Sequence, residues 1–227
     1  MNKPHITCYM MTSIDGRIDC EVTGSLPGVE EYYPLLEKLN FDASVSGRVT
    51  AELEIAEKGK FTSVTHTPVL SETFSNKSSA GDKFEIITDT KGSLLWKDNA
   101  EYDEHILIVT SEQVTKEYLA YLDEKKISYV ATGKDGIDLA RAMEILNVTF
   151  GVKTVGVVGG AAINTAFLDA GLLDEVIILI GAGIDGRAEF PPVFNRVQNK
   201  AVTPMELVDV KAYNSGAVCI RYKIKNN

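Results

Sequence analysis

The sequence is poor in the residues that build covalent or metal frameworks. Its 227 residues include three cysteines and three histidines, and Cys8, Cys20 and Cys219 lie far apart without a CxxC pair. Such sparse cysteine excludes a disulfide scaffold or a zinc ribbon and is typical of a reducing compartment. We therefore expect a cytoplasmic protein that binds no metal.

Positive charge and long apolar runs are also scarce. Lysine and arginine total 23 against 32 acidic residues, for a formal net charge of -9, and no run of 18 apolar residues occurs. These features exclude a general nucleic-acid or membrane-surface partner and predict no membrane-spanning helix. An anionic ligand would have to be held by local donors and helix termini.

Short apolar runs that alternate with helical patterns dominate the remainder. Strands are predicted at 5–11, 41–46, 84–88, 105–110, 127–131, 154–158 and 175–180, and helices at 30–39, 48–57, 111–123, 138–146 and 161–170. The ends 206–213 and 217–225 alternate apolar and polar residues around Asn214-Ser215-Gly216, which predicts an antiparallel hairpin. The pattern indicates one α/β domain over residues 1–227: three α/β/α layers, a mixed, mostly parallel sheet, and antiparallel strands at one edge.

The stretch 154–180 is the centre of this arrangement. It is predicted to form a strand, a Gly159-Gly160 turn, a helix whose buried face carries Ala162, Ile163, Ala166, Phe167 and Ala170, and a second strand. Without a Cβ at the two glycines, N–H groups at the helix start can approach a diphosphate closely. Tight packing of helix against strand is an equally acceptable reason for the two glycines.

Ligands of open α/β sheets bind beyond the carboxyl ends of the strands. This rule places one group of residues at a common rim: Ser13, Asp15, Gly47, Thr50, Thr88, Thr110, Gly133 and Gly159. The GxGxxG motif of the Rossmann fold is absent. A dinucleotide that binds here would therefore use another fold.

Three segments carry a family resemblance: MTSIDGRI from Met11, GRVT from Gly47, and VVGGAAINTAFLDAGLLDEVIILI from Val157. In order and spacing they resemble the riboflavin-biosynthesis reductase domain, whose fold is that of dihydrofolate reductase. The resemblance covers nearly the whole chain. It implies NADPH-dependent hydride transfer to a small heterocycle or sugar imine, as in 5-amino-6-(5-phosphoribosylamino)uracil reductase, and it implies a homodimer.

The resemblance also assigns residues. It implies that Gly160, Ala161, Ala162, Ile163 and Asn164 contact the NADP diphosphate and that Met11 and Thr50 lie along the cofactor, and we add the rim residues Gly159 and Thr88. The segment Ser13-Ile14-Asp15-Gly16 would separate cofactor from substrate.

The sequence departs from the family pattern on the substrate side. Val158 stands where an acidic residue is usual, and Thr50 is followed by Ala51-Glu52-Leu53-Glu54 without the usual aspartate and proline. Glu54 has roughly the offset of that aspartate. The HxE and PCxxC motifs of the deaminase that is often fused to this domain are absent.

Two acids at the rim are candidate proton donors. Asp15 and Glu54 are the predicted catalytic residues and, with Ser13, the predicted substrate contacts. The alternatives are that Asp15 caps a turn and that Glu54 is a solvated helix carboxylate. Either the protein is a reductase, or it is a degenerate family member that binds a nucleotide without reducing anything.

Cofactor choice and oligomeric state can also be predicted. Lys91 and Ser93, or Thr110-Ser111, can bind the phosphate on the adenosine ribose, which favours NADPH, whereas Asp89 could instead bind a free ribose hydroxyl. The hairpin is predicted to have one apolar face covered by helices and to leave an edge that Lys223 and Lys225 protect only partly. We expect a homodimer that involves this hairpin.

Overall fold

The computed structural model describes residues 2–196 and 201–225, which form two compact units. Unit 1 consists of the described residues up to Pro4 and of Asp42–Val155, and unit 2 consists of His5–Phe41 and the described residues from Gly156 onward. Each unit has its own strands and helices. In the described part of the chain, no helix is both long enough and apolar enough to cross a bilayer.

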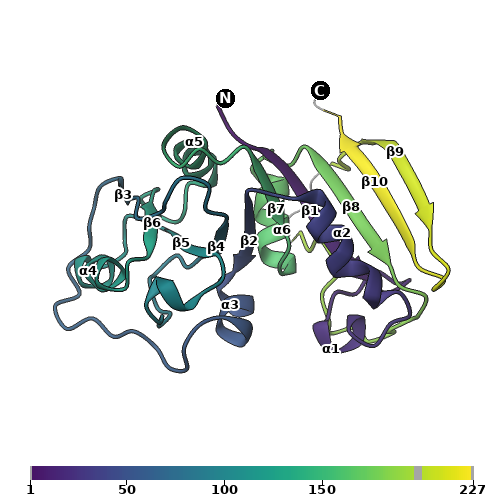
Figure 1. Cartoon of the computed structure of the whole chain (residues 1–227), viewed down its shortest axis with the longest axis horizontal. Helices are drawn as coiled ribbons and strands as arrows, with labels where there is room; N and C mark the ends of the chain where they lie inside the picture. The colour runs from purple at the N-terminus through teal and green to yellow at the C-terminus, as the bar shows by residue number, and fades with distance from the viewer. Residues whose placement is uncertain (1, 197–200, 226–227) are drawn as a thin grey trace. The chain divides into compact units, whose positions relative to one another are not determined.

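Unit 1 is a mostly parallel sheet with flanking helices (Figure 1). Its strands have the order β3-β6-β5-β4-β2, in which β2, β4, β5 and β6 are parallel and β3 is antiparallel to β6. The strands are β2 (Ala43–Gly47), β3 (Thr73–Ser75), β4 (Phe84–Thr88), β5 (His105–Thr110) and β6 (Ser128–Ala131). The helices are α3 (Arg48–Glu54), α4 (Lys116–Glu124), α5 (Leu139–Thr149) and the 3-10 turn η2 (Asn99–Glu101). Every residue of β5 is buried, as expected for a central strand covered on both faces.

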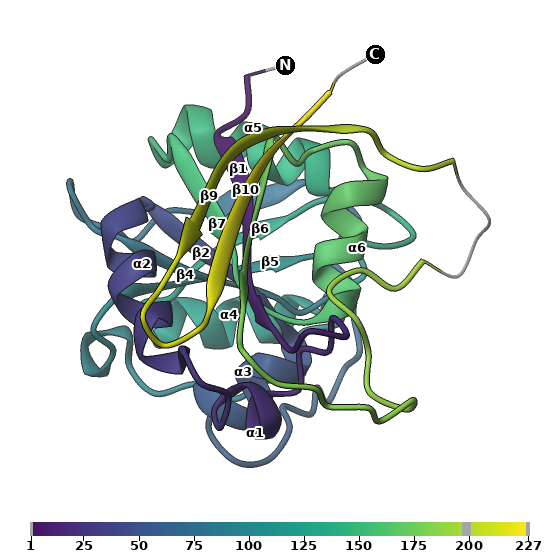
Figure 2. The ribbon, with the colours of Figure 1, turned by 90° about the vertical axis from the view of Figure 1, so that its right-hand side faces the viewer.

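Unit 2 combines a parallel strand pair with the C-terminal hairpin (Figure 2). Its strands have the order β1-β8-β10-β9, in which β1 and β8 are parallel and β8, β10 and β9 are antiparallel. The strands are β1 (His5–Thr12), β8 (Glu175–Ile180), β9 (Met205–Ala212) and β10 (Val218–Ile224), and β7 (Thr154–Val157) spans the boundary between the units. The helices are α1 (Cys20–Thr23), the 3-10 turn η1 (Val29–Glu31), α2 (Tyr32–Leu39) and α6 (Ala161–Asp169).

The predicted fold class is confirmed: the strands form a mixed, mostly parallel α/β arrangement with flanking helices and a C-terminal antiparallel hairpin. The prediction of antiparallel strands at one edge was incomplete. β3 is a further antiparallel strand, and it lies in the polar segment for which no strand was predicted. Three residues are too few to show a period-2 pattern, and pairing with β6 decides their conformation.

The helix predicted over 138–146 runs to Thr149, and two other helix boundaries were wrong because of partners distant in sequence. Ser111 does not cap a helix, because the carbonyls of Glu112 and Val114 accept from the N–H groups of Leu70 and Val69, both at 2.9 Å. Helix α4 begins at Lys116 with Thr115 as its cap. The helix predicted to reach Glu57 ends at Glu54, after which Glu57 pairs with Leu95. In both places a partner distant in sequence takes the hydrogen bond that the helix would have used.

Two predicted faces also differ. On α6 the buried residues are Ala161, Ile163, Asn164 and Phe167, whereas Ala162 and Ala170 are exposed. On the hairpin, no face of β9 is covered: all eight of its residues are exposed, including the apolar Leu207 and Val210. The alternation was read correctly as a strand, but an edge strand without a covering helix buries neither face.

Candidate functional site

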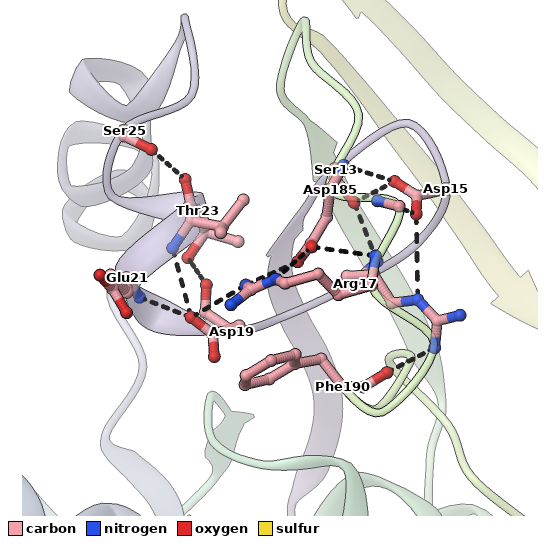
Figure 3. Close-up of polar contacts among 12 residues, drawn as sticks. Ser13, Asp15, Arg17, Asp19, Glu21, Thr23, Ser25, Asp185 and Phe190 are labelled. Atoms are coloured by element: carbon pink, nitrogen blue, oxygen red, sulfur yellow. Dashed lines mark hydrogen bonds and ion pairs between the residues drawn. The ribbon is translucent and has the colours of Figure 1, made fainter.

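The turn that follows β1 is closed by a carboxylate (Figure 3). The Ser13 hydroxyl donates to Asp15 Oδ1 at 2.7 Å and accepts from the Arg17 N–H at 3.1 Å, and Ser13 itself is buried. Asp15 also accepts from two N–H groups of a distant loop, those of Asp185 at 3.0 Å and Gly186 at 2.9 Å. The predicted substrate residues Ser13 and Asp15 therefore lie together, bonded to a segment that follows β8.

These hydrogen bonds fix the charge state of Asp15. The Ser13 hydroxyl first, and then the Asp185 and Gly186 N–H groups, hold the pKa of the Asp15 carboxyl well below its usual range. A carboxylate that accepts several hydrogen bonds is stabilised in its ionised form. In this conformation Asp15 has the properties of a turn-organising carboxylate, and its role as a proton donor stays a prediction.

The segment after β8 is the main feature that the sequence did not assign to the site. We call residues 183–196 the strap. At one end it bonds the turn: Gly183 C=O accepts from the Ile14 N–H at 2.8 Å, and Phe190 C=O accepts from the Arg17 guanidinium. Arg187 lies 3.8 Å from the Phe190 ring centroid and forms an ion pair with Asp185 at 2.5 Å. Asp185-Gly186 was the available signal, since Asp-Gly marks a turn, but a turn alone does not indicate a partner.

The other end of the strap is bonded to the first half of α6 (Figure 2). The Asn164 amide donates to the Val193 carbonyl at 3.0 Å, and the Thr165 hydroxyl accepts from the Asn195 N–H at 2.9 Å. Asn164 is fully buried, and its Oδ1 atom has no hydrogen-bond partner among the described residues. The strap thus connects the turn after β1 with the helix of the predicted cofactor cradle.

The start of α6 has the backbone geometry that its two glycines suggested. Gly160 is the N-cap with φ 74° and ψ 139°, a conformation that side-chain-bearing residues rarely adopt, and no side chain caps the helix. The first intrahelical bond runs from the Asn164 N–H to the Gly160 carbonyl at 3.1 Å, which leaves the N–H groups of Ala161, Ala162 and Ile163 without an intrahelical partner. The first turn carries no acidic residue. These residues fit an anionic group such as a diphosphate.

Met11 differs from the other predicted cofactor residues of unit 2. Its side chain is buried in an apolar cluster with Leu26, Leu179 and Ala217. Any contact with a cofactor would therefore have to come from its main chain.

In unit 1, the predicted rim residues gather at the ends of parallel strands. Gly47 pairs with Thr88, and Thr88 with Val109, so that β2, β4 and β5 end at the same level. The Thr88 hydroxyl donates to the Ser46 carbonyl at 3.3 Å, and Thr50 lies in the first turn of α3. Gly47, Thr50 and Thr88 thus lie at one rim of this unit, and that a ligand binds there stays a prediction.

A second carboxylate closes the turn after β4. Asp89 is buried and accepts from the N–H groups of Ser93 at 2.6 Å and Leu94 at 3.0 Å, and from the Ser93 hydroxyl at 3.3 Å. The hydroxyls of Thr110 and Ser111 both donate to the Thr90 carbonyl. Among the residues predicted to bind the adenosine ribose or its phosphate, Ser93, Thr110 and Ser111 use their hydroxyls within this turn. The exposed Lys91 does not use its ammonium group there.

Glu54 lies at the last residue of α3, two turns beyond the strand end at Gly47. Its charge contributes to raising the pKa of Glu85, which burial first of all raises to about 7. Glu85 is the second residue of β4 and accepts a hydrogen bond from the Ser44 hydroxyl, so it belongs to the amino-terminal half of that strand. The charge of Glu54 thus affects a residue near the start of β4, whereas the predicted cofactor residue Thr88 is at the end of that strand. The catalytic role of Glu54 stays a prediction.

Among residues 2–196 and 201–225, no three acidic, cysteine or histidine side chains are grouped so that they could hold a metal ion. His105 is a buried structural residue, with its ring nitrogens 2.9 Å from Asn99 Nδ2 and 2.7 Å from Ser128 Oγ. Burial lowers its pKa.

Comparison with known proteins agrees with this arrangement. The sequence matches the profile described as the RibD C-terminal domain over residues 4–219. Among solved structures, a pyrimidine reductase-like protein of Corynebacterium diphtheriae has a TM-score of 0.71 at 18% identity. The alignment covers 100% of this chain and 94% of the Corynebacterium chain. RibD of Acinetobacter baumannii has a TM-score of 0.71 at 16% identity over 99% of this chain. The riboflavin biosynthesis reductase of Saccharomyces cerevisiae has a TM-score of 0.65 at 19% identity over 99% of this chain and 91% of its own. The Acinetobacter protein is longer, and the present chain spans 59% of it.

Proposed function

We propose, from the premise that the chain belongs to the RibD C-terminal domain family, that it is an NADPH-dependent reductase of a small heterocyclic or imine substrate. The substrate would resemble 5-amino-6-(5-phosphoribosylamino)uracil, the compound that a structurally similar reductase of Thermotoga maritima is named for. That relative is a deaminase/reductase, and this chain spans 57% of it. NADPH would supply the hydride, and the protein would position the two reactants.

The observation that carries the proposal is the start of α6. Gly160 stands in a glycine-only conformation, and the N–H groups of Ala161, Ala162 and Ile163 are uncapped. A helix N-terminus of this kind favours negative charge both through its free N–H groups and through its dipole. We assign the diphosphate to these residues.

The strap and the turn after β1 would line the substrate side. The strap is bonded at both ends, to Asp15 and Arg17 and to Asn164 and Thr165. We assign to Asp15 the task of holding the strap, which makes it a positioning residue. Because the strap is bonded at both ends, it would exclude water from the place where hydride is transferred.

For the cofactor we propose NADPH over NADH. An NAD site commonly offers a carboxylate to the free ribose hydroxyl, and the candidate Asp89 is buried and bonded to Ser93 and Leu94. The exposed Lys91 supplies a cation for the additional phosphate. Calorimetric titration with both cofactors at equal salt tests this choice, and Lys91→Gln should narrow the difference; equal affinities in the unaltered protein would contradict it.

The direct test of the function is NADPH oxidation, followed by the absorbance of the nicotinamide ring, with a panel of ribosylaminopyrimidines, pterins and quinones. Turnover with a heterocyclic imine supports the proposal. Tight NADPH binding without turnover on any member would favour the second candidate, a nucleotide-binding protein without reductase activity. The ionised state of Asp15 and the presence of Val158 in place of an acid are the observations that favour that candidate.

We further propose that the protein is a homodimer. β9 is an edge strand, and it exposes the apolar residues Met205, Leu207, Val208 and Val210. An uncovered apolar edge is a common site of self-association. Light scattering should give twice the mass of the 24.8 kDa chain at micromolar concentration, and Val210→Lys should reduce that mass toward one chain. A single-chain mass for the unaltered protein would contradict the dimer.

A further inference from the structure

Unit 2 contains a pocket that shares no residue with the turn after β1, the strap or the start of α6. Its volume is about 240 Å³, and it lies between α2 and the sheet of β1, β8, β10 and β9. Its lining includes Tyr9, Leu35, Lys38, Lys211, Tyr213 and Arg221.

Strand register explains why the floor of the pocket is continuous. Tyr9 pairs with Ile177, Ile177 with Arg221, and Arg221 with Asp209, so the four side chains form one row on one face of the sheet. α2 covers that face incompletely, since none of its residues is fully buried. The hollow beside the helix is therefore a consequence of the fold.

The pocket is cationic in a protein whose net charge is -9. Three lysine and arginine side chains line it, against the single carboxylate of Asp209. Arg221 is neutralised by Glu175, which accepts from its Nη2 at 2.6 Å and from its Nε at 3.1 Å. Among the described residues, no carboxylate forms an ion pair with Lys38 or Lys211. Two ammonium groups thus remain available to an anion.

The aromatic side of the pocket holds an unused hydroxyl. Tyr213 Oη is buried and has no hydrogen-bond partner in the described part of the chain, whereas Tyr9 Oη donates to the Tyr32 carbonyl at 2.7 Å. A buried polar atom without a partner is unfavourable, but the Tyr213 hydroxyl has almost no accessible surface, so the pocket presents the ring of Tyr213 and not its hydroxyl. Lys211 Nζ lies 4.2 Å from the Tyr213 ring centroid, which brings a cation and the aromatic ring to the same wall.

We propose that this pocket binds a small aromatic carboxylate. A cavity of roughly 150 Å³ accepts a benzene ring, so about 240 Å³ accommodates one ring with a carboxylate. The ring packs against Leu35, Ile177 and Tyr9. The carboxylate accepts from Lys38 and Lys211.

Benzoate is the probe, and benzamide is its uncharged counterpart of the same shape. Titration of the full chain, followed by ligand-observed NMR without any cofactor, should give millimolar binding of benzoate and markedly weaker binding of benzamide. Each of Lys38→Gln and Lys211→Gln should weaken benzoate binding about two- to fivefold, the range of a solvent-accessible ion pair. Lys116→Gln, an exposed lysine of unit 1, is the control and should change nothing.

Tyr213→Phe is a second control. It removes the unused buried hydroxyl without changing the ring, so it should leave benzoate binding unchanged and the thermal midpoint unchanged or higher. Equal binding of benzoate and benzamide, or benzoate binding that neither lysine substitution affects, would overturn the proposal. A third outcome would also overturn it: Lys38→Glu or Lys211→Glu converts the dimer to a single chain in light scattering but leaves benzoate affinity unchanged. The two lysines would then contact a second copy of the chain and not a small carboxylate. None of these readouts depends on NADPH or on reductase activity.

Discussion

Helices α5 and α6 begin in opposite ways. Asp138 caps α5 by accepting from the Arg141 N–H at 3.0 Å, and Asp19 and Thr115 cap α1 and α4 in the same manner. Gly160 has no side chain to offer, so α6 starts with free N–H groups. A capped helix has satisfied part of its own N-terminus, whereas an uncapped one leaves those donors to water or a ligand. Helices α2 and α3 also lack a side-chain cap, but their N-cap residues have negative φ angles, whereas that of α6 is a glycine at φ 74°. The start of α6 is therefore the one that we assign to a cofactor.

The largest effect is expected at the uncapped start. Gly160→Val places a branched side chain among the free N–H groups, and NADPH affinity should fall by about tenfold or more, since each hydrogen bond to a charged group is worth roughly 1.5–3 kcal/mol. Fluorescence titration measures the affinity. Because φ at Gly160 is positive, the substitution also strains the backbone.

Gly171→Val is the matched control for that strain. Gly171 follows α6 at φ 66°, and nothing lies within 4 Å of the position of a Cβ there. It should destabilise the fold without changing NADPH affinity. Two results would show that the uncapped start of α6 does not bind the cofactor. One is an equal loss of NADPH affinity in Gly160→Val and Gly171→Val, and the other is unchanged NADPH affinity in a folded Gly160→Val protein.

An acid in the first turn of α6 should move stability and binding in opposite directions. Ala162 is exposed, so Ala162→Asp introduces a carboxylate without crowding. The helix dipole favours it by about 0.3–1 kcal/mol, whereas its charge repels a diphosphate. The thermal midpoint should rise slightly while NADPH affinity falls several-fold. Ala170→Asp, at the exposed far end of the same helix, should neither raise the thermal midpoint nor lower NADPH affinity. If Ala162→Asp changed the thermal midpoint and the NADPH affinity in the same direction, the result would argue against an anion site.

The capped start should show the reverse pattern. Asp138→Ala removes the acceptor for the Arg141 N–H, and the free energy of unfolding should fall by about 1 kcal/mol. Urea denaturation measures this loss, and Asp138→Asn should restore most of it. NADPH affinity should stay unchanged, and a loss of affinity would show that α5 also contributes to the site.

The smallest effect is expected from Asp15 and depends on pH. Its folded-state pKa is lowered, so its contribution is present above the unfolded value of about 3.9 and is lost as the pH falls below it. Thermal midpoints between pH 6 and pH 3 should therefore fall less steeply in Asp15→Asn than in the unaltered protein. Identical slopes would indicate that Asp15 does not hold the strap in solution.

The sequence predicted best those elements whose conformation depends on residues close by in the chain. β4 and β5 were predicted with their observed bounds, because an unbroken run such as HILIVT has no competing structure. The glycine geometry at the start of α6 followed from composition in the same way. Boundaries failed where a distant partner intervened: the carbonyls of Glu112 and Val114 accept from Leu70 and Val69, and the helix begins at Lys116 instead of after Ser111.

The candidate site was predicted less completely than the fold. Asp15 was predicted to be a catalytic and substrate-binding residue, with a turn cap as the alternative, but its partners Asp185 and Gly186 are 170 and 171 residues away along the chain. No local pattern records a bond of that span. The strap could be recognised only once β1 and β8 were seen side by side.

The order of the two units along the chain has a consequence for folding. Residues 42–155 of unit 1 are continuous, whereas unit 2 is assembled from segments on either side of them. β1 cannot pair with β8 until the intervening residues have been synthesised, and closing so long a loop is entropically unfavourable and slow. We expect pulse-labelled hydrogen exchange during refolding to protect β4 and β5 before β1 and β8. Because the cradle on α6 and the Asp15 turn both belong to unit 2, the capacity to bind a cofactor would then be the last property that the newly made chain acquires.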